Sequence, residues 1–328
     1  MGGKSVALHQ LLGRGIMTVQ LAYIVGAGHS GSTLLGILLG NHPRAATFGE
    51  LSSFDHVVRC NLRCTCGETI WQCPFWVSVI AAYAGTDGLR EIPDRWPTDT
   101  RRNAYTSSLA RLRYLFLALG LTWTPWVWGL SLVRTISPDA CRRATNAWCC
   151  NDAIRAAARK SVVVDTSKSA VRMRLLHAHR PQCIKTIFLT RDVRAVSASL
   201  TRRVATQQPS PSERAREWVR ANRLALASLR ALPREDCLHV TYEGLCRESE
   251  ATLTRAYRFL GLSVSDKPHR IDSEALHLIS GNPMRFRGVP AIREDLSWRV
   301  RLSSRDLARV EQIAGALNRR LLGDYYVA

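Results

Sequence analysis

The segment at residues 24–35, IVGAGHSGSTLL, constrains the fold of this chain more than any other. An apolar run ends in a glycine-rich turn, and a helix-forming sequence starts at Ser32–Thr33. Such a turn directs several backbone N–H groups toward one point, and the N-terminus of the following helix adds partial positive charge there. The segment therefore predicts a binding site for a phosphate-like anion.

A dinucleotide-binding motif overlaps this turn, because Gly26, Gly28 and Gly31 satisfy the pattern GxGxxG. Enzymes with that motif carry an acidic residue about 20 positions later, after a second strand. Glu50 lies near that distance, but residues 41–49 form a poor strand sequence. A dinucleotide-dependent oxidoreductase is therefore kept as an alternative.

The same glycines fit a second phosphate-binding pattern. Gly26 and Gly31 have the Walker A spacing, but Ser32 replaces the lysine that binds the β- and γ-phosphates of ATP. Without that lysine the turn lacks a main charge contact. A P-loop kinase or NTPase variant is therefore a weaker alternative.

Alternating strands and helices indicate the fold class. Short β-branched runs predict buried strands at residues 21–25, 161–165, 184–190 and 237–242. Helices are expected at 32–40, 170–180, 193–203, 212–232, 248–260 and 304–321. This pattern predicts an α/β fold with a central parallel sheet. A flexible lead-in at 1–20 precedes one domain at 21–328, whose mostly helical, Cys- and Trp-rich insertion at about 55–160 separates the first two of these strands.

The charge of the chain points to anionic ligands without selecting one. The chain has 46 Lys and Arg against 26 Asp and Glu, a formal charge of +20. Nucleic acids, acidic lipids and phosphorylated nucleotides would all be attracted by such a surplus. No basic stripe with interleaved aromatic residues accompanies it, so a specific nucleic-acid partner is not expected.

One apolar stretch has the length of a membrane span. Tyr114–Val133 contains twenty residues without a charge. Pro125 interrupts it, which favours two buried or groove-lining helices, with peripheral membrane contact through 114–133 left open. No secretory signal is visible at the start of the chain, so a cytoplasmic location, with membrane association as an option, is expected.

Four of the ten cysteines, Cys60, Cys64, Cys66 and Cys73, fall within fourteen residues. Their spacing is not a standard zinc pattern, and no His-x3-His segment supports one. Zinc binding, a disulfide pair and reduced packing thiols all stay open. No metal ligand is assigned.

Residues 26–43, GAGHSGSTLLGILLGNHP, resemble the 5′-phosphosulfate loop of the sulfotransferases that use 3′-phosphoadenosine 5′-phosphosulfate (PAPS). That family has a P-loop-type three-layer α/β/α fold, and its loop reads R/K-SGTTLL followed by His-Pro. Here Ser30–Leu35 match, and His29 stands where Arg or Lys is usual. The resemblance implies donor binding by Gly28, His29, Ser30, Gly31, Ser32 and Thr33.

Further segments resemble the same family in the same chain order. Residues 188–200, FLTRDVRAVSASL, resemble its 3′-phosphate segment, with Arg191 at the end of a strand and Ser199 in the following helix. Residues 238–245, LHVTYEGL, resemble a strand end whose tyrosine, here Tyr242, lies by the nucleotide. Residues 280–287, SGNPMRFR, resemble the loop that closes over it and supply Arg285 and Arg287. The stretch at 66–76, CGETIWQCPFW, also recurs in bacterial members.

The resemblance implies a mechanism and assigns three catalytic residues. Glu50 matches the catalytic glutamate of tyrosylprotein sulfotransferases and would act as the base. Lys168, in DTSKS at 165–169, would stabilise the oxygen that bridges sulfur and phosphorus, and His29 would contact the phosphate. No metal is required. The expected acceptor carries a hydroxyl on a small molecule, a glycan or a lipid-like compound, with peptide tyrosine as a further option.

Overall fold

The computed structural model describes residues 18–84, 98, 138–199, 209–266, 276–286 and 292–326. Within these residues, parallel strands form one sheet in the order β2-β3-β1-β4-β5. The strands are β1 (Leu21–Gly26), β2 (Ala45–Thr47), β3 (Val162–Lys168), β4 (Ile184–Thr190) and β5 (Cys237–Thr241). The central strand is β1, because Leu21 pairs with Val163 on β3 and with Ile184 on β4.

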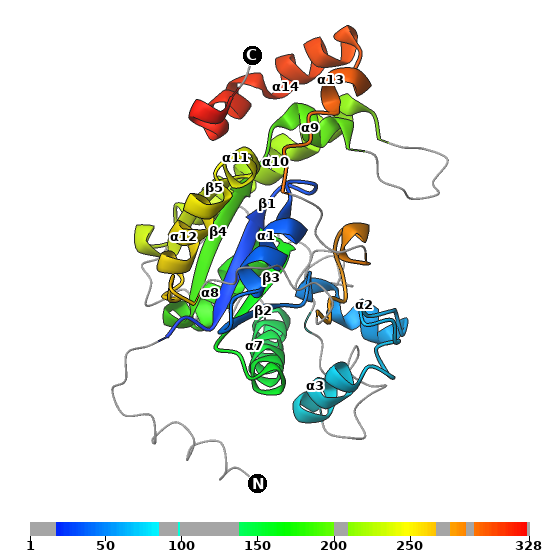
Figure 1. Cartoon of the computed structure of the whole chain (residues 1–328), viewed down its shortest axis with the longest axis vertical. Coiled ribbons are helices and arrows are strands. Elements are labelled where there is room, and N and C mark those ends of the chain that lie inside the picture. Colours follow the sequence, from blue (N-terminus) through cyan, green and yellow to red (C-terminus); the bar gives the residue numbers. More distant parts are fainter. Residues whose placement is uncertain are drawn as a thin grey trace.

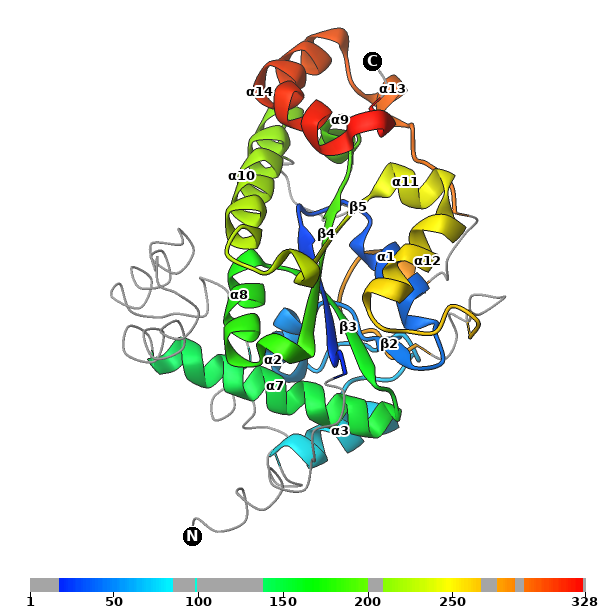
Figure 2. The same ribbon diagram turned by 90° about the vertical axis from the view of Figure 1, so that its left-hand side faces the viewer.

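Helices cover both faces of the sheet. Alternate residues of β1 point to opposite faces, so Tyr23 and Val25 join one apolar cluster while Ala22 and Ile24 join the other. On the first face lie α8 (Ala170–His179) and α10 (Pro211–Leu229), and on the second lie α1 (Ser32–Gly40), α11 (Tyr242–Arg247) and α12 (Ser249–Phe259) (Figure 2). This three-layer arrangement confirms the predicted α/β class with a central parallel sheet.

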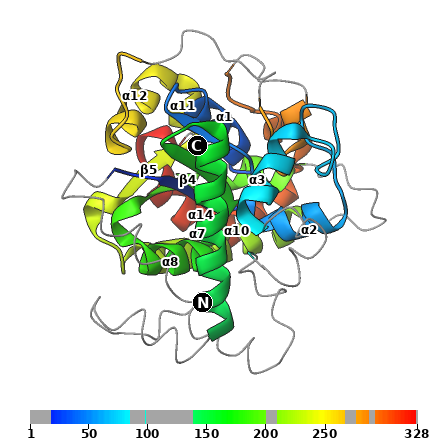
Figure 3. The same cartoon turned by 90° about the horizontal axis from the view of Figure 1, so that it is seen from below.

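The remaining helices lie at the ends of the sheet and beside one of its edges (Figure 1). Beyond the carboxyl ends of the strands, the structure has α9 (Val193–Ala198), α13 (Trp298–Arg301) and α14 (Ser304–Leu322). α2 (Phe54–Arg59) follows β2 and lies beside that edge of the sheet (Figure 1), with α3 (Pro74–Ala84) below it. α7 (Pro138–Ala158) leads to the start of β3 and crosses the molecule when seen from below (Figure 3). Short 3-10 turns are η1 (Leu51–Ser53), η4 (Pro181–Cys183), η5 (Arg234–Asp236), η6 (Pro283–Phe286) and η7 (Gly323–Tyr325).

The structure contains one strand that was not predicted, and this strand changes where the insertion lies in the order of the strands. Ala45–Thr47, inside the segment judged a poor strand, pairs with Val162–Val164 as β2. A three-residue edge strand needs only the backbone of its neighbour and no long apolar run. The insertion therefore follows the second strand of the chain and not the first. Its described parts, α2, α3 and α7, are helical, as expected, while the domain limits stay a prediction.

The apolar stretch Tyr114–Val133 lies outside the described residues. Among the residues that are described, no helix combines the length and the apolar character needed to cross a membrane.

Candidate active site

The carboxyl ends of β1, β3 and β4 meet at one edge of the sheet, and the predicted site residues lie there. The chain leaves β1 toward α1 on one face, but it leaves both neighbours, β3 and β4, toward helices on the opposite face (Figure 2). Divergence of this kind opens a crevice at the strand ends, which is where α/β proteins bind ligands. Gly26, Lys168 and Thr190 end these three strands.

Residues 26–33, called the cradle below, join β1 to α1. A Cβ on Gly26 would lie 2.2 Å from the Leu189 carbonyl oxygen, and a Cβ on Gly31, at φ 89°, would lie 2.5 Å from the Tyr242 ring. Both positions therefore require glycine. Gly28 has open space beside it, and the Ser30 hydroxyl is buried with no partner in the described part of the chain. A buried hydroxyl in this state at a helix N-terminus fits a phosphate oxygen.

Arg191 extends from the end of β4 toward the cradle. Its Nη1 donates to the His29 carbonyl oxygen at 3.0 Å, and its Nη2 donates to Asp295 at 3.2 Å. The guanidinium lies 4.3 Å from the centre of the Tyr242 ring. Its Nε is buried and has no partner among the described residues. The ring, the carbonyl and Asp295 thus fix a cation that keeps donors, Nε among them, available to an anion.

Ser199 reaches the same place from α9, but not from within the helix. The helix ends at Ala198, and Ser199 leaves it at φ −65°, ψ 113°. The prediction that Ser199 lies inside a helix extending to residue 203 is therefore wrong at this position. In the turned-out conformation the Ser199 hydroxyl lies 3.1 Å from Nδ1 of His29.

His29 is the residue through which the parts of the site interact. Burial lowers its pKa below 6.5, and the positive charges of Arg214, Lys168 and Arg191 lower it further. A pKa below 6.5 leaves most of the imidazole uncharged at pH 7, unlike the Arg or Lys that is usual at this position. Its backbone lies in the left-handed region at φ 62°.

Glu50 and Lys168 form an ion pair on the β3 side of the crevice. Lys168 Nζ lies 2.5 Å from Glu50 Oε1 and donates also to the Thr166 carbonyl oxygen at 3.2 Å. The two side chains are 25% and 19% exposed, so the pair is shielded but reachable. Lys168 adopts φ 65°, at the point where the pairing of β3 with β1 changes register.

Asp165 holds the two halves of this pair in place, a role that sequence reasoning missed. Its Oδ1 accepts from the backbone N–H of Leu51 at 3.2 Å and from that of Ser167 at 2.9 Å. It is 1% exposed, and its other oxygen contacts Arg172 at 3.4 Å. One buried carboxylate therefore fixes the residue after Glu50 and the residue before Lys168. The only sequence signal was an acidic residue at the end of an apolar run.

The segment at residues 276–286 packs over the cradle and over Glu50. The N–H of Asn282 donates to the Thr33 hydroxyl at 3.1 Å, and a Cβ on Gly49 would lie 2.2 Å from the Ser280 carbonyl oxygen. Burial lowers the pKa of Arg285, while attraction to Glu50 opposes that shift. Among the described residues, its buried Nε has no hydrogen-bond partner. Arg287, the other donor-binding arginine predicted in this segment, lies outside the described residues.

Glu243 is a second buried carboxylate that sequence reasoning missed. Its Oε1 accepts from the N–H of Asp192 at 2.9 Å and so fixes the turn after Arg191. Burial raises the pKa of Glu243 to about 7.

These contacts join residues from distant parts of the chain into two groups. His29, Arg191, Ser199 and Tyr242 lie on the β4 side, and Glu50, Lys168 and Arg285 lie on the β3 side. The first group suits a phosphate, and the second joins a carboxylate to two cations.

A sulfotransferase family model matches residues 88–266, more than half of the 328 residues. The chain belongs to the sulfotransferase family. The matched range contains Lys168, Arg191, Ser199 and Tyr242, and it begins after the cradle and Glu50. No curated protein matches the chain significantly.

Two solved structures are similar over most of the chain. The sulfotransferase domain of the Synechococcus PCC 7002 olefin synthase is 21% identical, with a TM-score of 0.49, over 92% of this chain and 95% of that domain. The sulfotransferase domain of the curacin biosynthetic pathway is 15% identical, with a TM-score of 0.48, over 91% of this chain and 97% of that domain.

Membership of the sulfotransferase family favours sulfotransfer over the oxidoreductase and kinase alternatives. The position of Glu50 agrees with this, because a dinucleotide site expects its acidic residue after the strand beside β1. Here Glu50 follows β2, which β3 separates from β1, and Glu50 is paired with Lys168.

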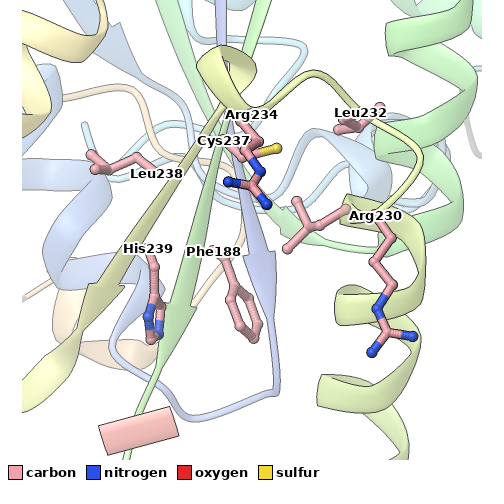
Figure 4. A pocket seen from close by; sticks show the side chains of 8 residues that line it. Phe188, Arg230, Leu232, Arg234, Cys237, Leu238 and His239 are labelled. Atoms are coloured by element: carbon pink, nitrogen blue, oxygen red, sulfur yellow. The ribbon is translucent and has the colours of Figure 1, made fainter. Parts of the chain in front are cut away.

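A hollow opens between β4, β5 and the residues that follow α10 (Figure 4). Phe188 and His239 lie side by side in it, with ring centres 5.1 Å apart. Burial lowers the pKa of His239 to about 4, and its Nε2 lies 2.9 Å from the Thr190 hydroxyl. The histidine is therefore neutral and already has a partner. Leu229, Arg230, Leu232, Arg234, Cys237 and Leu238 complete the lining.

The cysteines correct one further expectation. All ten are free thiols, so the disulfide alternative is wrong. Cys60 stands apart from Cys64, Cys66 and Cys73, because its sulfur lies 3.5 Å from His56 on its own helix turn.

Proposed function

We propose that this sulfotransferase uses PAPS as its donor and transfers the sulfuryl group to an acceptor hydroxyl. The observation that carries the proposal is that Arg191 and Ser199 both lie within hydrogen-bonding distance of His29, a residue of the cradle. Anion-binding groups from β1, β4 and α9 thereby lie side by side. A nucleotide with two separate phosphates would use both sets.

The residues present fit such a donor. The backbone N–H groups of Ser30–Thr33 and the Ser30 hydroxyl would hold the 5′-phosphate, and Arg191 and Ser199 would hold the 3′-phosphate. The buried Ser30 Oγ and Arg191 Nε support this assignment, because both lack a partner among the described residues. Buried polar groups without partners are uncommon, and a ligand oxygen would satisfy them.

Glu50 is the proposed general base. In the transfer, the bond between sulfur and the phosphate oxygen breaks, a sulfur–oxygen bond to the acceptor forms, and the hydroxyl proton goes to Glu50. The ammonium of Lys168, 2.5 Å from Glu50 Oε1, would hold the carboxylate in position to accept this proton. Lys168 and Arg285 would offset the negative charge that the leaving bisphosphate acquires.

The acceptor class remains a proposal of its own. The apolar segment at 114–133 favours a hydrophobic small molecule or a lipid-like acceptor over a glycan, and the same segment is the candidate for membrane contact. A panel of sterol, fatty-alcohol, phenol and sugar acceptors with labelled PAPS would rank these classes. Transfer to sugars alone would contradict the preference.

Nucleotide binding tests the donor directly. Calorimetry should show that adenosine 3′,5′-bisphosphate binds more tightly than adenosine 5′-monophosphate by about 10- to 100-fold, the worth of a charge-assisted contact to one phosphate. Arg191→Ala should abolish that difference while leaving the affinity for the monophosphate within about 3-fold. Equal affinities in the wild type, or tighter binding of NAD or ATP, would overturn the proposal.

A further inference from the structure

Three cysteines and one histidine bring their side chains together outside the active site. The ligand atoms of Cys64, Cys66, Cys73 and His277, called the cysteine–histidine cluster below, all lie within 4.8 Å of one another. Cys66 Sγ is 3.6 Å from Cys73 Sγ, and His277 Nδ1 is 3.3 Å from Cys73 Sγ and 3.6 Å from Cys64 Sγ. His277 is 213 residues from Cys64 in the chain.

These three separations lie within about 0.2 Å of the edges of a tetrahedron around one zinc ion, and the remaining pairs of ligand atoms lie within 4.8 Å. With Zn–S bonds of about 2.3 Å and Zn–N bonds of about 2.0 Å, tetrahedral angles place two sulfurs about 3.8 Å apart and a sulfur about 3.5 Å from a nitrogen. A disulfide would need its sulfurs at about 2.05 Å. The cluster therefore has the spacing of metal ligands and not that of an oxidised pair.

Backbone donors already point at two of the sulfurs. The N–H of Cys66 donates to the Cys64 sulfur, and the N–H of Trp76, in the first turn of α3, donates to the Cys73 sulfur. Such donors stabilise thiolates, the form of cysteine that binds metal. A divalent cation among the sulfurs would supply the positive charge that buried thiolates need.

Backbone hydrogen bonds and a tight turn shape the loop that carries the cysteines. An isolated antiparallel bridge joins Arg63 to Thr69 across it, and the N–H of Cys64 donates to the Glu68 carbonyl oxygen at 2.8 Å. Gly67, at φ 97°, closes the tight turn by donating its N–H to the Cys64 carbonyl oxygen at 3.1 Å. Within this loop, Cys64 and Cys73 are fully buried.

The ring of His277 is fixed from outside the cysteine loop. It stacks on Phe75 with ring centres 4.9 Å apart and planes 11° apart. Its carbonyl oxygen accepts from Trp76 Nε1 at 3.1 Å. These contacts hold the imidazole with Nδ1 toward the sulfurs, which is how a metal-binding histidine is oriented.

We propose that Cys64, Cys66, Cys73 and His277 bind one structural Zn²⁺ ion. Three thiolates and one imidazole form a ligand set typical of closed tetrahedral zinc sites. The four protein ligands fill the coordination sphere and leave no position for a substrate. Binding releases the thiol protons to solvent.

The site would attach the cysteine loop to the segment that covers the cradle. Thr65 N–H donates to the Leu278 carbonyl oxygen at 3.2 Å, and Leu278 N–H donates to the Thr65 hydroxyl at 2.9 Å, directly beside His277. The same segment continues to Asn282, which contacts Thr33, and to Arg285. The positioning of Arg285 rests on the proposed function, whereas metal binding does not.

Metal analysis of the full chain, purified without a metal-affinity tag, tests the site. We expect about one zinc ion per chain after dialysis against zinc and a chelator wash. Cys66→Ser removes a ligand whose residue is exposed, and it should weaken zinc binding at least about 100-fold. Cys60→Ser is the matched control and should keep the metal. Replacement by Co²⁺ should give the visible absorption of tetrahedral thiolate coordination.

A measurement on the wild type keeps the test valid if Cys66→Ser fails to fold. In the zinc-loaded protein, alkylation followed by mass spectrometry should modify Cys60 and spare Cys66, although both are exposed. Chelation should make both react. The proposal is overturned if the wild type holds no zinc, if both cysteines react equally when zinc is supplied, or if Cys60→Ser loses the metal and Cys66→Ser does not. Binding of adenosine 3′,5′-bisphosphate, measured in parallel, reports on the donor separately.

Discussion

The cradle and the cysteine–histidine cluster both gather polar groups at one point, but the fold stabilises them in different ways. The cradle lies between β1 and α1, and apolar clusters on both faces of the sheet fix its geometry. The cysteine–histidine cluster lies on a loop with one isolated bridge and draws its fourth member from position 277. Sheet topology therefore positions the first group of residues, whereas loop contacts and the segment at 276–286 bring the second together.

The two regions are connected through residues 276–286. His277 lies at one end of this segment, and Asn282 and Arg285 lie at the other. The comparison thus divides the molecule into a part that binds and reacts and a part that holds the covering segment in place.

The largest effect is expected at Glu50. Glu50→Gln removes the proton acceptor but keeps the shape of the side chain, so turnover should fall about 10²- to 10⁴-fold. The affinity for adenosine 3′,5′-bisphosphate should change by less than about 3-fold, because the cradle is untouched. Rates with labelled PAPS and calorimetry would measure the two quantities. Glu235→Gln, an exposed site in η5 before β5, is the control, and equal rates in both variants would exclude Glu50 as the base.

The same substitution, glycine to alanine, can be made in the cradle and in the loop that carries the cysteines. Gly31 and Gly67 both have positive φ, but a Cβ would meet the Tyr242 ring at 2.5 Å in the cradle and open space in the cysteine loop. Gly67→Ala should reduce the free energy of unfolding by about 1 kcal/mol from backbone strain alone. Gly31→Ala should cost at least about 2 kcal/mol and also weaken bisphosphate binding. Urea unfolding would measure both, and equal losses would mean that the ring moves aside freely.

The pH dependence of binding should reveal His29. Its pKa lies below 6.5 in the protein because the ring is buried among cations, and a bound phosphate would raise it. Binding would then take up a proton, so affinity for the bisphosphate should rise as the pH falls from 8 toward 6. Relative to His29→Gln, the rise should be about 3- to 10-fold. Calorimetry in buffers of different ionisation enthalpy would detect the proton. Identical profiles in the two proteins would contradict the prediction.

The smallest effect is expected from the two serines of the α9 region. Ser199→Ala should weaken bisphosphate binding about 5-fold, less than a full hydrogen bond to a charged group because the Ser199 hydroxyl gives up its contact with His29 on binding. Ser197, two residues earlier and within α9, is the matched control. Loss of affinity in Ser197→Ala but not in Ser199→Ala would reassign the contact.

Much of the sheet and of the cradle could be predicted because their signals are local. The runs that form β1 and β4 are apolar and β-branched, and the structure ends them within one residue of the expected positions. The places of Gly26 and Gly31 could be predicted because a tight strand-to-helix turn leaves no room for a side chain at these positions. Arg191 was identified from the resemblance of residues 188–200 to the 3′-phosphate segment of the sulfotransferases.

Other features had no local signal. The strand β2 is three small residues that become a strand only beside β3. Ser199 looks like part of a helix, and only the chain turning toward His29 ends α9 before it. His277, and not Cys60, is the fourth member of the cysteine–histidine cluster. Membership depends on which side chains meet in the fold and not on their spacing along residues 60–73.

The sequence by itself determined the parallel α/β core and the anion-binding turn, because hydrophobic periodicity and glycine positions act over a few neighbouring residues. The tertiary structure alone decided that Glu50 pairs with Lys168, that His29 is neutral between Arg191 and Ser199, and that His277 joins three cysteines. Ion pairs, burial and metal-ligand sets depend on distances across the fold, and residues 118 to 213 positions apart reach those distances only after the chain has folded.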